Sequence, residues 1–140
     1  IMSEDELSSL YNSSEINSFI TFTSGEGWGR SIAEAISCDL PVIVPGWSGH
    51  MDFVNAEYSK VLPTKMIPVP SIYHHTGWFT QDSKWSMISD ENIVSTILEY
   101  KNKFVEEERL KKAQTYGTIF RETFNSKETY SKLPDLIKDI

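Results

Sequence analysis

The sequence has a single cysteine, no long apolar run and fewer basic than acidic residues. One cysteine excludes an internal disulfide framework and is typical of a reducing compartment; Cys38 is expected to be a small packing residue. The apolar runs are far shorter than the roughly 20 residues of a membrane-spanning helix, and no signal-peptide pattern is visible. We therefore expect a cytoplasmic protein with no membrane span, and a peripheral membrane association stays open for a full-length parent protein.

Basic residues are scarce, since 13 stand against 20 acidic residues and the formal net charge is −7. No basic stripe and no interleaving of basic with aromatic residues occurs, which argues against nucleic acid as the main ligand. Histidine is also scarce. His74 and His75 are adjacent, so their side chains point apart, and no third ligand follows at a typical spacing. We therefore expect no metal site. The length predicts one domain, residues 1–140, with a sizeable core.

Residues 19–45 carry the clearest structural pattern in the chain. Residues 19–22 are aromatic or β-branched and predict a short buried strand. Three glycines follow within residues 25–29, where they allow a tight turn and the close approach of a ligand. Residues 30–38 predict a helix with a small apolar face, and residues 42–44 predict a second buried strand. Together they predict one β-α-β unit with parallel strands and a right-handed crossover.

The turn and the start of this helix form the candidate site. The first backbone amides of a helix lack intrahelical partners and carry partial positive charge, so they favour an anion such as phosphate. Glu26 lies in the turn and Glu34 about one turn into the helix, which separates them by on the order of 10 Å. That separation suits two anchors on one elongated ligand, because carboxylates accept paired hydrogen bonds from the vicinal hydroxyls of sugars. The alternative is that Glu26 braces the loop and Glu34 is a solvated helix residue.

This stretch resembles the donor-binding motif of retaining, GT-B-fold glycosyltransferases of the family-4 type (glycosyl transferases group 1). The motif has two glutamates separated by seven residues, and here it reads EGWGRSIAEA, followed by LPVI. In that family the first glutamate holds the transferred sugar and supports its reacting end, the second holds the ribose, and the amides between them hold the diphosphate. The resemblance therefore makes Glu26 the catalytic residue and gives Glu34 the ribose. It adds the following donor-binding residues: Gly25, Gly27, Trp28, Gly29, Arg30 and Ser31.

Two residues depart from the family pattern. Asp39 stands where the family often has glycine, and Arg30 stands where an aliphatic residue is common, which leaves the role of Arg30 open. The resemblance covers residues 3–62 well and the remainder loosely. It implies that an N-terminal domain, which usually carries the acceptor site, and the first strands of this domain are missing. We therefore expect the chain to be a fragment of a longer protein.

The segment after the second strand is the next candidate part of the site. It leaves the sheet at the carboxyl edge of the strands, where such folds bind ligands, and resembles a glycine-containing loop of the same family. The resemblance places Ser48, Gly49 and His50 near the donor. The alternative for His50 is a loop histidine hydrogen-bonded to backbone, and Asp52 is expected to cap the following turn.

The remainder of the chain shows weaker patterns. Ser3 and Glu6 form a capping-box pattern, and the apolar stripe over residues 7–11 predicts a first helix on the sheet. Residues 58–62 predict a third strand. Residues 63–89 are rich in proline and aromatic residues and show no sustained periodicity, which is unusual for a compact domain. Two interpretations stay open: a lid or acceptor-side loop whose aromatics stack on sugar, or an insertion held to the body by those aromatics.

The chain is predicted to be helical from Asp90, the expected N-cap, onward. Apolar stripes over residues 93–98 and 110–124 predict helix faces that pack, and residues 131–140 predict a last helix.

Taken together, these patterns predict an α/β domain with a Rossmann-like parallel sheet flanked by helices, the partial C-terminal half of a GT-B fold, and a helical C-terminal segment. The resemblance implies a hexosyltransferase that binds a UDP- or GDP-sugar and transfers the sugar to an acceptor hydroxyl with retention, without metal or cofactor. We expect the isolated chain to be inactive without its acceptor domain. Two alternatives stay open: a non-catalytic nucleotide-sugar-binding module and a nucleotide-sugar epimerase of the same fold.

Overall fold

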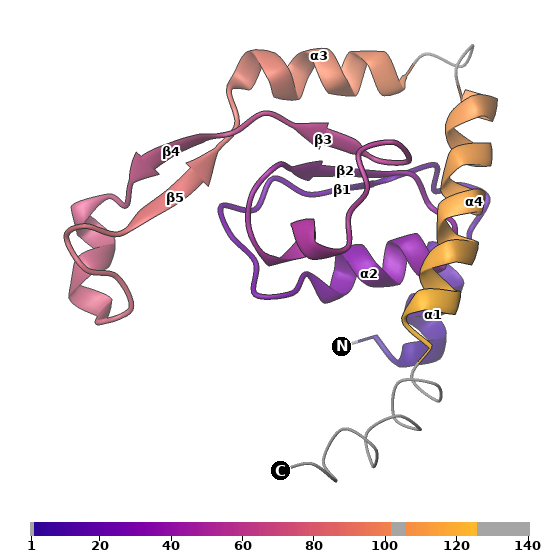
Figure 1. Ribbon diagram of the computed structural model, residues 1–140, viewed down its shortest axis with the longest axis horizontal. Coiled ribbons are helices and arrows are strands. Elements are labelled where there is room, and N and C mark those ends of the chain that lie inside the picture. Colours follow the sequence, from indigo (N-terminus) through magenta and orange to yellow (C-terminus); the bar gives the residue numbers. More distant parts are fainter. Residues whose placement is uncertain (1, 102–105, 126–140) are drawn as a thin grey trace, which may run out of the picture.

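The chain alternates helices and strands in its first half and continues through a hairpin into two further helices (Figure 1). A computed structural model describes residues 2–101 and 106–125. The elements of the first half are α1 (Glu4–Tyr11), β1 (Phe19–Ile20), α2 (Arg30–Ser37), β2 (Val42–Pro45), the 3-10 helix η1 (Gly49–Asp52) and β3 (Lys60–Leu62). Those that follow are β4 (Lys65–Pro68), the 3-10 helix η2 (Ser71–Thr76), β5 (Lys84–Met87), α3 (Asp90–Tyr100) and α4 (Glu106–Thr123).

The three strands β1, β2 and β3 form a parallel sheet in that order. The predicted β-α-β unit is therefore confirmed, with Phe19 opposite Val42 and the helix α2 between the two strands. The predicted buried strand over residues 19–22 is only partly right. β1 is shorter, and the side chains of Ile20 and Phe22 are each 39% exposed. Within the described residues β1 pairs with β2 alone, so it is an edge strand and its outer side remains open.

The central strand β2 divides the core into two halves. Successive side chains of a strand point to opposite faces of the sheet. Val42 and Val44 accordingly pack with α2 and α4, whereas Ile43 packs with Leu62 and the first turn of α3. All three β2 side chains are almost completely buried, and burial of each stabilises the fold by about 1.5–3 kcal/mol. The sheet is thus covered by helices on both faces, as a Rossmann-like arrangement requires (Figure 1).

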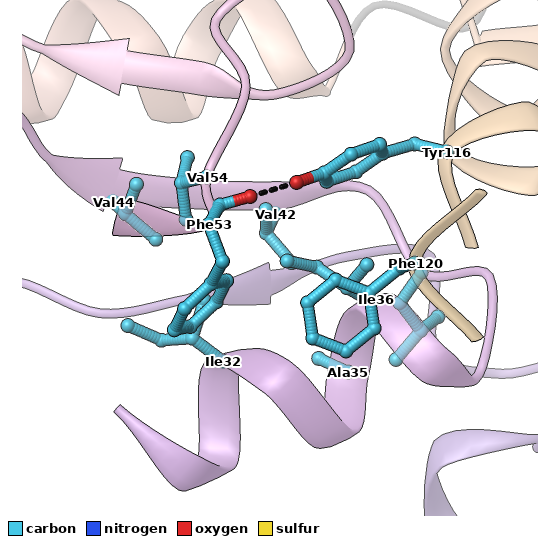
Figure 2. Close-up of a cluster of buried hydrophobic side chains, with 10 residues drawn as sticks. Ile32, Ala35, Ile36, Val42, Val44, Phe53, Val54, Tyr116 and Phe120 are labelled. Atoms are coloured by element: carbon cyan, nitrogen blue, oxygen red, sulfur yellow. Dashed lines mark hydrogen bonds between the residues drawn. The ribbon is translucent and has the colours of Figure 1, made fainter. Parts of the chain in front are cut away.

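The larger half of the core lies between α2 and α4. Ile32, Ala35 and Ile36 of α2 are buried against aromatic side chains that include Phe53 and Phe120 (Figure 2). The remaining aromatic of α4, Tyr116, donates its hydroxyl to the carbonyl of Phe53 and stacks on Tyr58 at 5.3 Å. The predicted apolar stripe of α4 is confirmed at Ala113, Gly117 and Phe120, which are all buried.

Contacts from α4 support the backbone conformation of Asp39, the residue that stands where the resembled family often has glycine. Asp39 has a φ of +60°, in the left-handed region that favours glycine. Its carboxylate accepts a hydrogen bond from Arg121 Nη1 at 2.7 Å, and the same nitrogen donates to the carbonyl of Ser37 at 2.6 Å. Gly117 lies directly beside this junction, because a Cβ there would overlap the Asp39 carboxylate and come within 2.7 Å of the Ile36 carbonyl oxygen.

Residues 63–89 hold a structure that the sequence pattern did not predict. Strands β4 and β5 form an antiparallel hairpin, with Lys65 opposite Met87 and Pro68 opposite Lys84, and η2 lies in the connection. The hairpin projects from the sheet at the end away from α4 (Figure 1). Proline at the end of a short strand hid the alternating pattern, yet Pro68 is tolerated because it lies in an edge strand. Trp85 packs within the hairpin, against Tyr73 and Phe79.

The helix ends confirm one cap and correct another. Ser3 is the N-cap of α1, and both bonds of the capping box with Glu6 are formed, which lowers the pKa of the Glu6 carboxyl. The N-cap of α3 is Ser89 and not Asp90, because the Ser89 hydroxyl accepts the amide of Asn92 at 3.3 Å.

The predicted packing face of α3 is right for only part of its length. Ile93 packs on the sheet, whereas Val94 and Leu98 are more than half exposed. The predicted helix over residues 131–140 lies outside the described residues. Within the described part of the chain, no helix is long and apolar enough to cross a membrane.

The contact at Gly117 generates a stability prediction. Alanine is the better helix former by about 1 kcal/mol, but its methyl group would overlap the Ile36 carbonyl and the Asp39 carboxylate. We expect Gly117→Ala to lower the free energy of unfolding by about 1–3 kcal/mol in urea titrations followed by circular dichroism. Gly25→Ala is the matched control, because its Cβ would meet only Ser48 Oγ at 3.7 Å. A Gly117→Ala variant as stable as the parent would contradict the close contact.

Candidate functional site

The glycine-rich turn leads from β1 directly into the N-terminus of α2. Gly29 is the N-cap, with a φ of +86°, and a Cβ there would come within 3.0 Å of Ile32 and 3.1 Å of His50. Gly29 therefore has both a conformational and a steric reason to lack a side chain. Among the described residues no side chain caps α2 at this end, so the first amides of the helix remain open to an external acceptor. Gly27, by contrast, has no atom within 4 Å of its Cβ position.

Ser48 clamps the turn at the backbone of Glu26. The Glu26 amide donates to Ser48 Oγ at 2.7 Å, and the Ser48 hydroxyl donates to the Glu26 carbonyl at 2.5 Å. The amide of Gly49 donates to the same carbonyl at 3.1 Å. Ser48 has a φ of +93° and a ψ of −176°, a conformation that is otherwise almost confined to glycine and costs about 1–3 kcal/mol. The clamp is therefore formed against backbone strain.

The Glu26 carboxylate is not part of this clamp. Among the described residues it has no hydrogen bond or ion pair, whereas both backbone groups of Glu26 are engaged. The bracing of the loop, which was the alternative role for this residue, is thus carried by its backbone. Its carboxylate remains available to a ligand.

Gly49 and His50 lie close to the turn but present no side chain to solvent. A Cβ on Gly49 would overlap the carbonyl oxygen of Gly27, so the two loops touch backbone to backbone. The His50 ring is completely buried, and its Nε2 bonds to the carbonyl of Pro45 at 2.7 Å. This bond requires the proton on Nε2, and Nδ1 has no hydrogen-bond partner among the described residues. The structure thus agrees with the alternative for His50, a histidine that holds its own loop.

Glu26 lines a hollow of about 460 Å³ that is open to solvent. Its walls come from the glycine-rich turn, the loop after β2 and the hairpin β4–β5, and consist of Thr23, Ser24, Gly25, Glu26, Gly27, Trp47, Ser48, Phe79, Lys84 and Trp85. Such a volume lies within the range of about 300–1,000 Å³ in which small-molecule sites fall. Three of the lining residues are aromatic, namely Trp47, Phe79 and Trp85, and Lys84 and Glu26 bring one cation and one anion to the same hollow.

Glu34 lines a second hollow, of about 450 Å³, between α1 and α2. The carboxylate lies 3.7 Å from Arg30, whose side chain is 87% exposed, and the Glu34 side chain is 36% exposed. An exposed pair at this distance contributes little to stability, so a ligand can compete for the carboxylate. The linings of the two hollows follow one another along the chain, since Gly27 lines the first and its neighbour Trp28 lines the second.

Three other side chains define the second hollow. The Trp28 ring packs against Phe53 at 4.7 Å, so it ties the turn to the core. Burial, and next the charge of Glu34, raises the pKa of the Tyr11 hydroxyl, which is therefore a neutral hydrogen-bond donor at physiological pH. Burial is also the main cause that raises the pKa of Cys38, so its thiol stays protonated and is a poor nucleophile. Cys38 is half-buried and free, in agreement with a packing role.

Several residues of these hollows were not found from the sequence. The sequence predicts only a packing role for Tyr11. It predicts no role for Trp47, which lies between the strand predicted over residues 42–44 and Ser48. Lys84 reaches the site through the hairpin, which local patterns did not reveal, whereas Trp85 is one of the aromatics of residues 63–89 for which stacking on sugar was one of two interpretations. The high aromatic content of residues 63–89 was the available signal in the sequence. Among the described residues, no group of three or more His, Cys, Asp or Glu side chains is placed to hold a metal ion.

No protein-family profile matches the sequence, and no curated protein is significantly similar to it.

The strained clamp at Ser48 predicts that a glycine variant at this position is more stable than an alanine variant. Ser48→Ala and Ser48→Gly both lose the two bonds to the Glu26 backbone, but only glycine adopts the Ser48 conformation freely. We expect the alanine variant to be destabilised and the glycine variant to keep about 1–3 kcal/mol more free energy of unfolding than the alanine variant. Urea titration measures the difference. An alanine variant at least as stable as the glycine variant would contradict strain at this position.

Proposed function

We propose that this chain is the donor-binding part of a retaining GT-B-type glycosyltransferase of the family-4 type. One observation carries the proposal: Glu26 and Glu34 each line a hollow, and the N-terminus of α2, which no described side chain caps, lies between them in the chain. The amide donors at the start of α2 lie in the chain between the carboxylate acceptors of Glu26 and Glu34. An elongated ligand with a central phosphate group fits this order. A nucleotide sugar has that form, with hydroxyls on the sugar and on the ribose and a diphosphate between them.

Each part of the site would have a distinct task in sugar transfer. Glu34 would accept hydrogen bonds from the ribose hydroxyls, and Glu26 from the hydroxyls of the transferred sugar. The amides from Gly27 to Ser31 would hold the diphosphate, where the partial positive charge of the helix terminus is strongest. The same charge would stabilise the negative charge that develops on the departing diphosphate, which is an electrostatic contribution to catalysis. The acceptor hydroxyl would come from a second domain, so transfer by this chain alone is expected to be negligible.

The clamp at Ser48 fits this assignment. Catalytic groups must be held in the productive geometry by their surroundings. Both backbone groups of Glu26 are fixed by Ser48, while the carboxylate is left without a partner among the described residues. Backbone strain at a binding loop is a common feature of functional sites. A non-catalytic module that binds nucleotide sugars, or an epimerase of the same fold, would use the same groups and stays the alternative.

The two-anchor arrangement predicts separable effects of the two glutamates. In calorimetric titrations with UDP, GDP and their sugars, we expect Glu34→Ala to weaken binding of every nucleotide form by about tenfold or more. Glu26→Ala should weaken only the sugar-bearing forms, by a similar factor, because a hydrogen bond to a charged group is worth about 1.5–3 kcal/mol.

Glu57→Ala is the matched control, because Glu57 is exposed and lines neither of these two hollows. Equal affinities for the parent and both site variants would refute the assignment of the motif, and the titration also identifies the base.

A further inference from the structure

The hairpin β4–β5 forms one wall of the hollow that contains Glu26. It contributes Phe79, Lys84 and Trp85, while Trp47 comes from the loop after β2. None of these residues belongs to the glycine-rich motif. The wall therefore depends on a contact between segments that are about 60 residues apart in the chain.

The hairpin is fixed to the turn by Ser86. This residue is 2% exposed, and both its amide and its hydroxyl donate to the carbonyl of Ser24, at 3.0 and 3.2 Å. Ser24 lies two residues before Glu26, so the wall and the carboxylate are held to the same short piece of backbone. The neighbouring residue of β5, Trp85, is packed between Tyr73 and Phe79, which limits its movement. These contacts hold the hairpin in place as one wall of the hollow.

The chemistry of the hollow matches a pyranose ring. Such a ring has faces of C–H groups, which pack on aromatic side chains, and a rim of hydroxyls, each of which can donate and accept hydrogen bonds. Trp47, Phe79 and Trp85 offer the aromatic surface. The Glu26 carboxylate only accepts hydrogen bonds and the Lys84 ammonium only donates them, so the pair can bind neighbouring hydroxyls of the same ring. One charge of each sign leaves the hollow balanced, which suits an uncharged sugar.

We propose that the hairpin β4–β5 is the sugar-selecting wall of this site, and that Trp47, Lys84 and Trp85 bind the neutral hexose part of the ligand opposite Glu26. This inference rests on the proposed function, because it adds to the same site a wall that the motif does not supply.

The four tryptophans provide a direct test, because each indole N–H gives its own signal in a proton–nitrogen NMR spectrum. Trp47 and Trp85 line the Glu26 hollow, Trp28 lines the Glu34 hollow, and Trp78 is 84% exposed and lines neither. We expect UDP or GDP to shift the Trp28 signal. The matching UDP-glucose or GDP-mannose should shift Trp28, Trp47 and Trp85, with Trp78 unchanged in every titration.

Side-chain removal gives a second measurement that does not depend on the packing of Trp85. Trp47→Ala and Lys84→Ala alter exposed residues, and we expect each to lower the affinity for the nucleotide sugar about tenfold while the affinity for the nucleotide stays constant. Lys65→Ala and Trp78→Ala are matched controls in the same hairpin and outside the hollow, and both should bind as the parent does.

The possible results separate this inference from the proposed function. If nucleotides shift Trp28 but the attached sugar shifts neither Trp47 nor Trp85, or if the Trp47 and Lys84 variants bind as the parent does, the sugar-selecting wall is refuted and the proposed function stands. If neither nucleotides nor nucleotide sugars shift any indole signal, the proposed function fails and this inference fails with it.

Discussion

The contact between two loops at the backbone of Glu26 determines the shape of the candidate site. The loop after β2 approaches so closely that Gly49 has no room for a Cβ against the Gly27 carbonyl, and the Ser48 hydroxyl bonds both backbone groups of Glu26. Because these two loops leave neighbouring parallel strands, the contact sets the turn relative to the sheet as well as to the start of α2. The strain at Ser48, about 1–3 kcal/mol, is offset by two hydrogen bonds that together contribute a similar amount. The carboxylate of Glu26 is left outside this network.

Charge raises a question for any phosphate-bearing ligand, because the chain has a formal net charge of −7. Whether these acidic residues repel the ligand depends on the distance over which their charges act. At physiological ionic strength the Debye length is about 8 Å, so exposed carboxylates elsewhere on the surface act only weakly on the turn. The N-terminus of α2, with its aligned peptide dipoles, and the side chain of Arg30 lie at the turn itself. The acidic residues elsewhere on the surface therefore do not by themselves argue against a diphosphate at the turn.

Local patterns predicted the parts of the structure that depend on neighbouring residues. The β-α-β unit, the helix α2 and the capping box of α1 follow from glycine spacing, periodicity and side-chain reach over three or four residues. The N-cap of α3 was missed by one position, because Ser89 and Asp90 are both competent caps and backbone conformation selects between them. The hairpin and the two hollows could not be predicted, since they depend on contacts such as Ser86 with Ser24 that join distant segments. The motif predicted the candidate site, and tertiary contacts supply the walls of its two hollows.

The junction of α2 with α4 constrains how this sequence can change over evolution. The residue at position 39 needs a left-handed backbone, which glycine adopts freely and aspartate adopts with help from Arg121. Position 117 must at the same time stay without a side chain, because the Asp39 carboxylate and the Ile36 carbonyl occupy the space. Positions 39 and 121 are therefore coupled, because glycine at position 39 would remove the ion-pair partner of Arg121, whereas the Ile36 carbonyl would still keep position 117 without a side chain. Related chains that carry glycine at position 39 should accordingly be free to vary at position 121 but should keep glycine at position 117.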